Sequence, residues 1–167
     1  MAQLHFFLAA WPSREVRSGL RLRLAKLGPQ DWPTGGRCEM PARWHLTLSY
    51  LGAADPAPLQ RRLDDCWPGP FPITLRLDRI GAFHGGRVLW LGAREVPAAL
   101  AGWRQGCLGE DSTPANPFLP HVTLLRAPRP WPWVEQTIKP LRWTLEELAL
   151  VASVDGQYTL LRRWRVA

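Results

Sequence analysis

The spacing of apolar residues predicts a strand and then a helix at the start of the chain. Residues 4–10 form an apolar run that reads as a buried strand, because it is too short for a membrane span and no basic segment precedes it. After Pro12 and Ser13, apolar residues recur at helical spacing, which predicts a helix ending at Gly28-Pro29. The apolar positions of this helix are Val16, Leu20, Leu24 and Leu27.

Alternation of apolar and polar residues predicts strands over much of the remaining chain. One strand begins near His121, and the others cover about 42–51, 73–83, 88–91, 143–154 and 158–166. Gly85-Gly86 and Asp155-Gly156 separate neighbouring strands and are typical of hairpin turns. We therefore expect two hairpins, one in the middle of the chain and one at its end.

Two more helices are predicted between these strands. Asp55-Pro56 is typical of a helix start, and that helix extends to about Cys66. Residues 95–108 form the other, although its two glycines weaken helical structure. Loops are expected over 29–37 and 113–120, and 130–138 fits either a short helix or an irregular segment.

Strand, helix and strand occur in each half of the chain, and no linker separates independent domains. We therefore expect residues 1–167 to form a single α+β domain of two pseudo-symmetric lobes. Each lobe would have a mainly antiparallel sheet with helices outside. At 167 residues with 46% hydrophobic residues, the chain can bury a core of its own.

A tetrapeptide occurs once in each predicted lobe, as His45-Leu46-Thr47-Leu48 and as His121-Val122-Thr123-Leu124. Because side chains alternate along a strand, each histidine shares a face with its threonine, while the apolar residues anchor the other face. We expect the two motif strands to face each other across a central cleft. This arrangement would be a symmetric two-histidine site.

The chain carries 21 Lys plus Arg against 14 Asp plus Glu, a net charge of +7, and only Lys26 and Lys139 are lysines. Arginine suits bidentate contact with phosphates and stacking on bases, so an RNA or nucleotide partner is one interpretation. A protein from an arginine-rich proteome is the other. Charge alone does not separate these interpretations.

The three cysteines, Cys38, Cys66 and Cys107, are odd in number and have no CxxC spacing. This pattern suggests neither a disulfide framework nor a zinc ribbon, and it fits a reducing cytoplasm. We also expect no metal site, because His45 and His121 would need further ligands and threonines are poor ones.

The sequence resembles the two-histidine phosphoesterase superfamily, and within it the bacterial RNA 2′,3′-cyclic phosphodiesterases once named 2′-5′ RNA ligases (the LigT or ThpR type). The resemblance covers most of the chain. Its motifs are residues 4–9, 44–52, 80–83, 87–92, 118–126, 150–153 and 156–161. Family members commonly have an arginine near position 5 and an asparagine before the first motif, whereas this chain has His5 and Arg43-Trp44. We expect that difference to affect substrate contacts rather than the chemistry.

The two motifs match the needs of cyclic phosphate hydrolysis. Opening the ring requires a base for water and an acid for the leaving ribose oxygen, and two imidazoles can supply both near neutral pH. Thr47 and Thr123 can hydrogen-bond the phosphoryl oxygens. The resemblance implies that His45 is the proton donor and His121 the proton acceptor, that a 2′-phosphate is left, and that no cofactor takes part. The sequence itself does not fix which histidine does which.

Two further residues are candidates for substrate binding. Arg126 lies five positions after His121, so strict alternation places it on the opposite face, whereas the resemblance implies that it reaches the phosphate. Phe83, beside a turn, could stack on a base, while Trp90 and Tyr158 are expected in the core. We expect His5 to be an interior residue and His84 a solvated loop residue.

Three functions remain open at this stage. The first is a metal-independent phosphodiesterase that acts on RNA ends carrying a 2′,3′-cyclic phosphate. The second is a 2′-5′ RNA ligase that uses the same site in reverse. The third is a noncatalytic RNA-binding module, in which the arginines would matter and the histidines would not. We expect a cytoplasmic monomer without a membrane partner.

Overall fold

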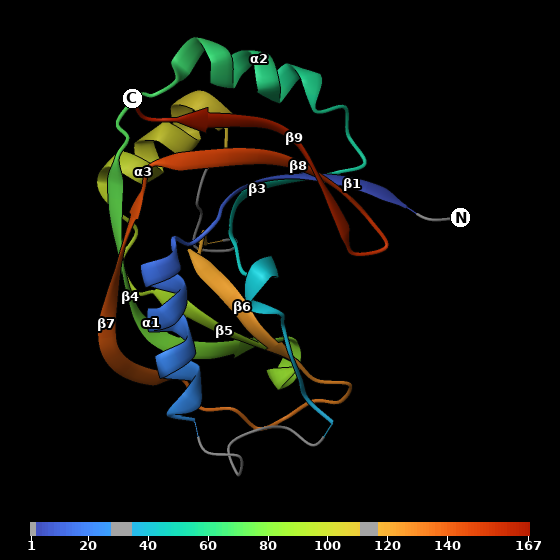
Figure 1. Ribbon diagram of the computed structural model, residues 1–167, viewed down its shortest axis with the longest axis vertical. Coiled ribbons are helices and arrows are strands. Elements are labelled where there is room, and N and C mark those ends of the chain that lie inside the picture. Colours follow the sequence, from blue (N-terminus) through green and yellow to red (C-terminus); the bar gives the residue numbers. More distant parts are fainter. Residues whose placement is uncertain (1–2, 28–34, 111–116) are drawn as a thin grey trace.

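The computed structural model describes residues 3–27, 35–110 and 117–167 (Figure 1). Its strands are β1 (Leu4–Ala10), β2 (Arg37–Cys38), β3 (Leu46–Gly52), β4 (Ile73–Phe83), β5 (Val88–Ala93), β6 (His121–Arg126), β7 (Gln136–Leu145), β8 (Glu147–Val154) and β9 (Gln157–Arg165). Its helices are α1 (Arg14–Ala25), α2 (Ala57–Cys66) and α3 (Ala98–Trp103), with short turns η2 (Pro41–Arg43), η3 (His84–Gly86) and η4 (Arg104–Leu108).

The strands form one curved antiparallel sheet in the order β7-β4-β5-β6-β3-β1-β8-β9, with β2 paired to β6. Two four-stranded lobes make up this order, β7-β4-β5-β6 and β3-β1-β8-β9. They meet where β3 pairs with β6, and that pairing consists of Leu46 opposite Val122 alone. The predicted α+β domain of two lobes is confirmed, and the two motif strands are direct neighbours at the junction.

Helices lie on the outside of the sheet (Figure 1). Ser13 caps α1, since its hydroxyl accepts a hydrogen bond from the Val16 amide at 3.2 Å. Arg23 of α1 donates hydrogen bonds to two carbonyls of β7, which fixes this helix on the first lobe. Asp64 of α2 accepts a hydrogen bond from the Trp164 indole at 2.8 Å, which ties that helix to β9.

The motif strands are anchored by their apolar residues in the main core. Leu46 and Val122 are fully buried, and Leu48 and Leu124 are at most 1% exposed. The residues of each motif therefore alternate as the sequence predicts, with the histidine and threonine on the other face. Burial of the leucine side chains thus holds the polar face in place.

Several predicted elements have different limits in the structure. The predicted strand 143–154 is two strands, because Trp143 and Leu145 end β7 opposite β4 and a new strand starts at Glu147. The predicted helix 95–108 begins at Ala98 and changes to a π-helical turn at Arg104. The first motif strand begins at Leu46, since Pro41–Arg43 forms a 3-10 turn.

Other expectations are settled only in part. Residues 130–135 are irregular, and the strand β7 begins at Gln136, so the irregular alternative is correct up to that point. Both predicted hairpins are present, as β4–β5 and β8–β9. α1 ends at Ala25 with Lys26 as its C-cap, before the expected Gly28-Pro29. Residues 29–34 and 113–116 of the expected loops lie outside the described residues.

The expectation that the cysteines form no disulfide is wrong. Cys66, at the end of α2, is bonded to Cys107 in η4, with Cα atoms 6.4 Å apart, and Cys38 is free. The two cysteines are 41 positions apart, so their proximity depends on how α2 packs against η4. An odd count with no CxxC spacing carries no information about such a contact.

Candidate active site

The four motif side chains lie together in one cavity of about 300 Å³ at the junction of the lobes. The cavity is lined by His45, Thr47, His121 and Thr123, together with Glu39, Arg43, Tyr50, Arg126 and Tyr158. Because β3 and β6 run antiparallel through the Leu46–Val122 pair, His45 is level with Thr123 and Thr47 is level with His121. Each histidine therefore has the other motif's threonine as its neighbour across the junction.

The two imidazoles are oriented by the same backbone contact. Nδ1 of His45 lies 2.7 Å from the carbonyl of Arg43, and Nδ1 of His121 lies 2.7 Å from the carbonyl of Leu119. A carbonyl only accepts, so each Nδ1 carries a proton and donates it. In the neutral ring this leaves the lone pair on Nε2, which is the nitrogen free for acid–base chemistry.

Burial changes the acidity of both histidines. Burial lowers the pKa of His45, and the hydrogen bond to the Arg43 carbonyl opposes this effect. The charges of His121 and Arg43 lower the pKa further, and the charge of Glu39 raises it. Burial also lowers the pKa of His121, with the Leu119 carbonyl opposing and the Arg126 charge adding to the effect. Both imidazolium ions are thus stronger acids than in water.

Aromatic rings hold each imidazole from the side. Phe7 and Trp11 stack on His45, with centroids 5.0 and 5.1 Å from the imidazole, and Tyr158 approaches it edge-on at 5.6 Å. On the other lobe, Phe83 packs edge-on against His121 at 5.0 Å. These contacts restrict ring rotation and exclude water from the sides of the cavity.

An extra residue in β6 turns Arg126 into the cavity. Neighbouring β5 residues Leu89 and Trp90 pair with Leu125 and Thr123, so Leu124 is the additional residue of a β-bulge. Leu124 and Leu125 are both fully buried, which confirms that alternation breaks there. Strict alternation is therefore the wrong guide to Arg126, because the bulge moves it to the face of His121 and Thr123.

The first motif has the same bulge, and it brings in a residue that the sequence analysis missed. In the pairing with β1, Leu8 and Ala9 face Ser49 and Thr47, so Leu48 is the extra residue. Tyr50 thereby lines the cavity at the position equivalent to Arg126 in the repeated motif. Counting five residues from each histidine could have revealed this relation.

Tyr50 also explains the place of His5. The Tyr50 hydroxyl lies 2.8 Å from His5 Nδ1, and the two rings stack at 5.9 Å. His5 is therefore half-buried at the rim of the cavity and is not the interior residue that the alternation suggested. His84 is exposed in the β4–β5 turn, as predicted.

Glu39, Arg43 and Tyr158 also line the cavity, and of these the sequence indicated only Arg43, as a departure from the family pattern. Arg126 Nε donates to Glu39 Oε1 at 2.6 Å. Arg43 places its guanidinium 4.9 Å from the centre of the Tyr158 ring and donates to the Tyr158 hydroxyl at 3.4 Å. Tyr158 was expected in the core, but it is half-buried and forms the cavity wall.

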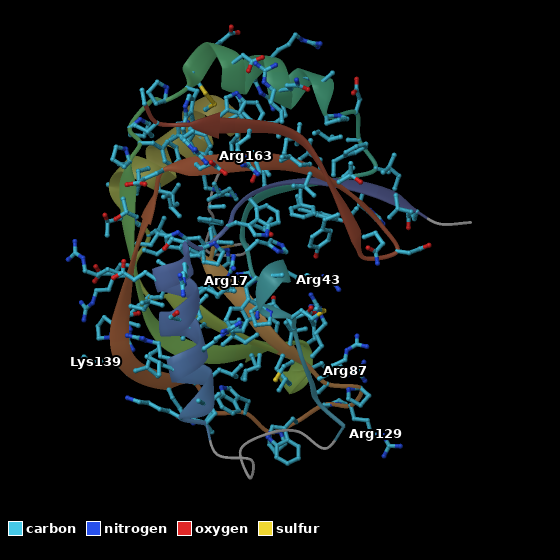
Figure 2. All side chains as sticks on the ribbon, viewed as in Figure 1. Arg17, Arg43, Arg87, Arg129, Lys139 and Arg163 are labelled. Carbon is cyan, nitrogen blue, oxygen red and sulfur yellow. A yellow bond between two sulfur atoms is a disulfide. The ribbon has the colours of Figure 1, made fainter. Side chains whose placement is uncertain are left out.

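Basic side chains continue beyond the cavity along one side of the molecule. Figure 2 shows Arg43, Arg87 and Arg129 on the side where η2 and the β4–β5 turn lie. Within the cavity itself the cations are Arg43 and Arg126. This side therefore carries positive charge that would attract a phosphodiester chain.

Phe83 lies next to the cavity that holds the two histidines and not in it. Its ring contacts His121 and, at 5.2 Å, Trp90, which is buried as predicted. Phe83 instead lines a larger cavity of about 720 Å³ that borders the first. Among the described residues, no three His, Cys, Asp or Glu side chains gather as metal ligands would.

The fold and site define a class of proteins in which two lobes bring a pair of His-X-Thr motifs to one cavity. The family model of the 2′-5′ RNA ligase superfamily matches residues 39–157. This chain therefore belongs to the 2′-5′ RNA ligase superfamily. The helices that the structure describes include none with the length and apolar character needed to cross a membrane.

Individual relatives agree with this assignment. An RNA 2′,3′-cyclic phosphodiesterase of Escherichia coli (strain K12) is 32% identical over 154 residues, covering 79% of this chain and 81% of that protein. The RNA 2′,3′-cyclic phosphodiesterase of Thermus thermophilus is 31% identical over 166 residues, covering 90% of this chain and 82% of that protein. The crystal structure of Escherichia coli LigT complexed with 3′-AMP has a TM-score of 0.72, 29% identity and 98% coverage of both chains.

Proposed function

We propose that this protein is an RNA 2′,3′-cyclic phosphodiesterase that hydrolyses a terminal cyclic phosphate to a 2′-phosphomonoester by metal-independent acid–base catalysis. The observation that carries the proposal is the pair of imidazoles in one cavity, each with Nδ1 bonded to a carbonyl and Nε2 free. The names of the relatives from Escherichia coli and Thermus thermophilus support the substrate class.

In the proposed reaction, Nε2 of His121 takes a proton from water as the water oxygen attacks phosphorus. The bond from phosphorus to the ribose 3′ oxygen breaks, and Nε2 of His45 donates a proton to that oxygen. The hydroxyls of Thr47 and Thr123 donate hydrogen bonds to the non-bridging oxygens, where charge develops. The products are a 2′-phosphate and a free 3′-hydroxyl.

The charges around His121, but not those around His45, support this division of roles. At His45 the charges oppose one another: His121 and Arg43 lower the pKa, and Glu39 raises it by a smaller amount, so the proton-donor role rests on the family resemblance. Arg126 favours the neutral form of His121, as a base requires.

Arg126 is proposed as a phosphate-binding residue of the same site. Its side chain is 54% exposed, and Glu39 orients it while leaving guanidinium donors available to the cavity. Two donors of one guanidinium match two phosphoryl oxygens. Phe83 is proposed to contact the base from the neighbouring cavity.

The test is to incubate the protein, in EDTA, with a short RNA that ends in a 2′,3′-cyclic phosphate and to follow the products by phosphorus NMR. We expect a 2′-phosphomonoester, and we expect His45→Ala and His121→Ala to lose nearly all turnover while remaining folded. An unchanged cyclic phosphate would refute the proposal. RNA binding that survives both substitutions, without hydrolysis by the wild type, would indicate a noncatalytic RNA-binding module.

Ligation is a second candidate activity, because the matching family is named the 2′-5′ RNA ligase superfamily. In the reverse reaction a 5′-hydroxyl replaces water, and the acid and base exchange roles. We expect hydrolysis to dominate in dilute solution, since water is in large excess. Adding a 5′-hydroxyl RNA to the same assay and measuring 2′-5′-linked product gives the ratio of the two activities.

We propose that the protein acts as a monomer in the cytoplasm on RNA ends. The RNA substrate supports this location, whereas the cysteine pattern no longer does, because Cys66 and Cys107 are bonded. Light scattering of the purified protein would test the oligomeric state.

A further inference from the structure

A second cavity adjoins the catalytic cavity on the side of His121. Its volume is about 720 Å³, and it shares Thr47, Tyr50 and His121 with the catalytic cavity. A nucleotide whose phosphate lies between the two histidines could therefore extend directly into it. The two cavities differ in charge and in lining.

Aromatic rings form part of the second cavity. Phe83 lines it from the end of β4, and Phe118 lines it from the segment before β6. Tyr50 stands at the boundary between the two cavities, with 64% of its surface exposed. Such rings favour stacking with a flat heterocycle.

The polar end of this cavity is built around Arg104 of η4. Its residue surface is only 7% exposed, and its guanidinium lies 3.6 Å from the centre of the Phe118 ring. Nε donates to the carbonyl of Leu48, the bulge residue of β3, at 3.1 Å. Nη2 donates to Glu110 Oε2 at 2.6 Å.

Glu110 is held in place from both sides. Arg104 binds one carboxylate oxygen, and the hydroxyl of Ser49 donates to the other. The Glu110 side chain remains 34% exposed and lines the cavity. Each carboxylate oxygen has a further lone pair, so Glu110 can accept hydrogen bonds from a ligand.

This chemistry selects a base and not a phosphate. Arg104 and Glu110 neutralise each other, and a carboxylate repels a phosphate, whereas Arg43 and Arg126 give the catalytic cavity its cations. Among the four RNA bases, guanine presents two adjacent donors, N1–H and N2–H, to one carboxylate. On the same Watson–Crick edge, adenine, cytosine and uracil place a hydrogen-bond acceptor beside their donor, and a carboxylate oxygen repels that acceptor.

We propose that the second cavity binds the base of the nucleotide that carries the cyclic phosphate, and that Glu110 makes it prefer guanine. Placing that nucleotide rests on the function proposed above. Arg104 and Ser49 are positioning residues, because they act by orienting the Glu110 carboxylate.

The experiment compares the four nucleoside 2′,3′-cyclic monophosphates by kcat/KM. We expect guanosine to exceed the others by about tenfold or more, the discrimination typical of a bidentate contact with a base. Glu110→Gln, which keeps the shape of the side chain, should remove the guanosine preference mainly through KM. Glu135→Gln, which alters an ion pair with Arg79 outside both cavities, should retain it.

Binding of 3′-GMP and 3′-AMP, measured by calorimetry, separates this inference from the catalytic proposal. If no cyclic nucleotide is hydrolysed, the proposed activity fails, and tighter binding of 3′-GMP that is lost in Glu110→Gln would still support the subsite. Equal affinity for both nucleotides in the wild type would overturn it. A guanine preference that persists in folded Glu110→Gln would also overturn the role of Glu110.

Discussion

Leu46 and Val122 face each other as the single paired position between β3 and β6. This pair relates the two motifs by an approximate two-fold symmetry, since His45 lies level with Thr123 and Thr47 with His121. The symmetry extends to the bulges at Leu48 and Leu124. One apolar contact in the core thus sets the relative position of the two histidine–threonine pairs.

The optimum pH for hydrolysis should lie below the ordinary imidazole pKa of about 6.5. Activity rises as the proposed base His121 loses its proton and falls as the proposed acid His45 loses its own, and burial lowers the pKa of both. The dependence of kcat/KM on pH measures the two apparent values. An optimum above pH 7 would contradict this prediction.

The carboxylate of Glu39 should contribute to that profile. Glu39→Gln removes a negative charge that raises the pKa of His45, so the alkaline limb should move to lower pH. The same pH series tests this shift, with Glu135→Gln as a control, because Glu135 pairs with Arg79 and does not line the cavity. An alkaline limb that stays in place would exclude an effect of Glu39 on the acid.

Replacing Arg126 should weaken catalysis without unfolding the protein. The side chain is more than half exposed, and we expect Arg126→Ala to lower kcat/KM by about 10- to 100-fold. Arg126→Lys keeps the charge but loses the planar pair of donors, so it should restore activity only in part. Steady-state kinetics of both variants, with melting temperatures, would check this. Full activity of Arg126→Ala would contradict a phosphate contact.

The bond between Cys66 and Cys107 should stabilise the fold. It closes a loop with a sequence separation of 41, and removing such a crosslink typically costs about 2–4 kcal/mol. We expect Cys66→Ser, or a reductant, to lower the melting temperature. Cys38→Ser should leave the melting temperature unchanged, and a reductant should still lower it, because Cys38 is free. Thiol titration of the native protein should detect one free cysteine, and three would contradict the disulfide.

Two glycines should respond oppositely to alanine. Gly86 has a φ of +89°, and a Cβ there would overlap the Trp131 carbonyl oxygen, so Gly86→Ala should destabilise the fold. Gly102, in α3, has no atom within 4 Å of that position, and Gly102→Ala should stabilise the helix by about 0.5–1 kcal/mol. Chemical denaturation measures both, and equal effects would contradict the argument.

The local features of the fold could be predicted from the sequence because they depend on neighbouring residues. The spacing of apolar residues predicted the first strand, α1 and both hairpins. The repeated motif predicted that His45 and Thr47 share one face of their strand, and that His121 and Thr123 do the same in theirs. The break at Glu146 was missed, because alternation continues across it while the pairing partner changes from β4 to β1.

The tertiary structure decided what depends on contacts between distant segments. The bulges that turn Tyr50 and Arg126 into the cavity arise from pairing with β1 and β5, and the disulfide arises from packing of α2 on η4. The carboxylate of Glu110 is held at its cavity by the buried Arg104 of η4 and by Ser49 of β3, which is 61 positions away in the sequence. The sequence by itself determined the chemical groups and their local faces, whereas packing decided which groups share a cavity, since that requires long-range pairing.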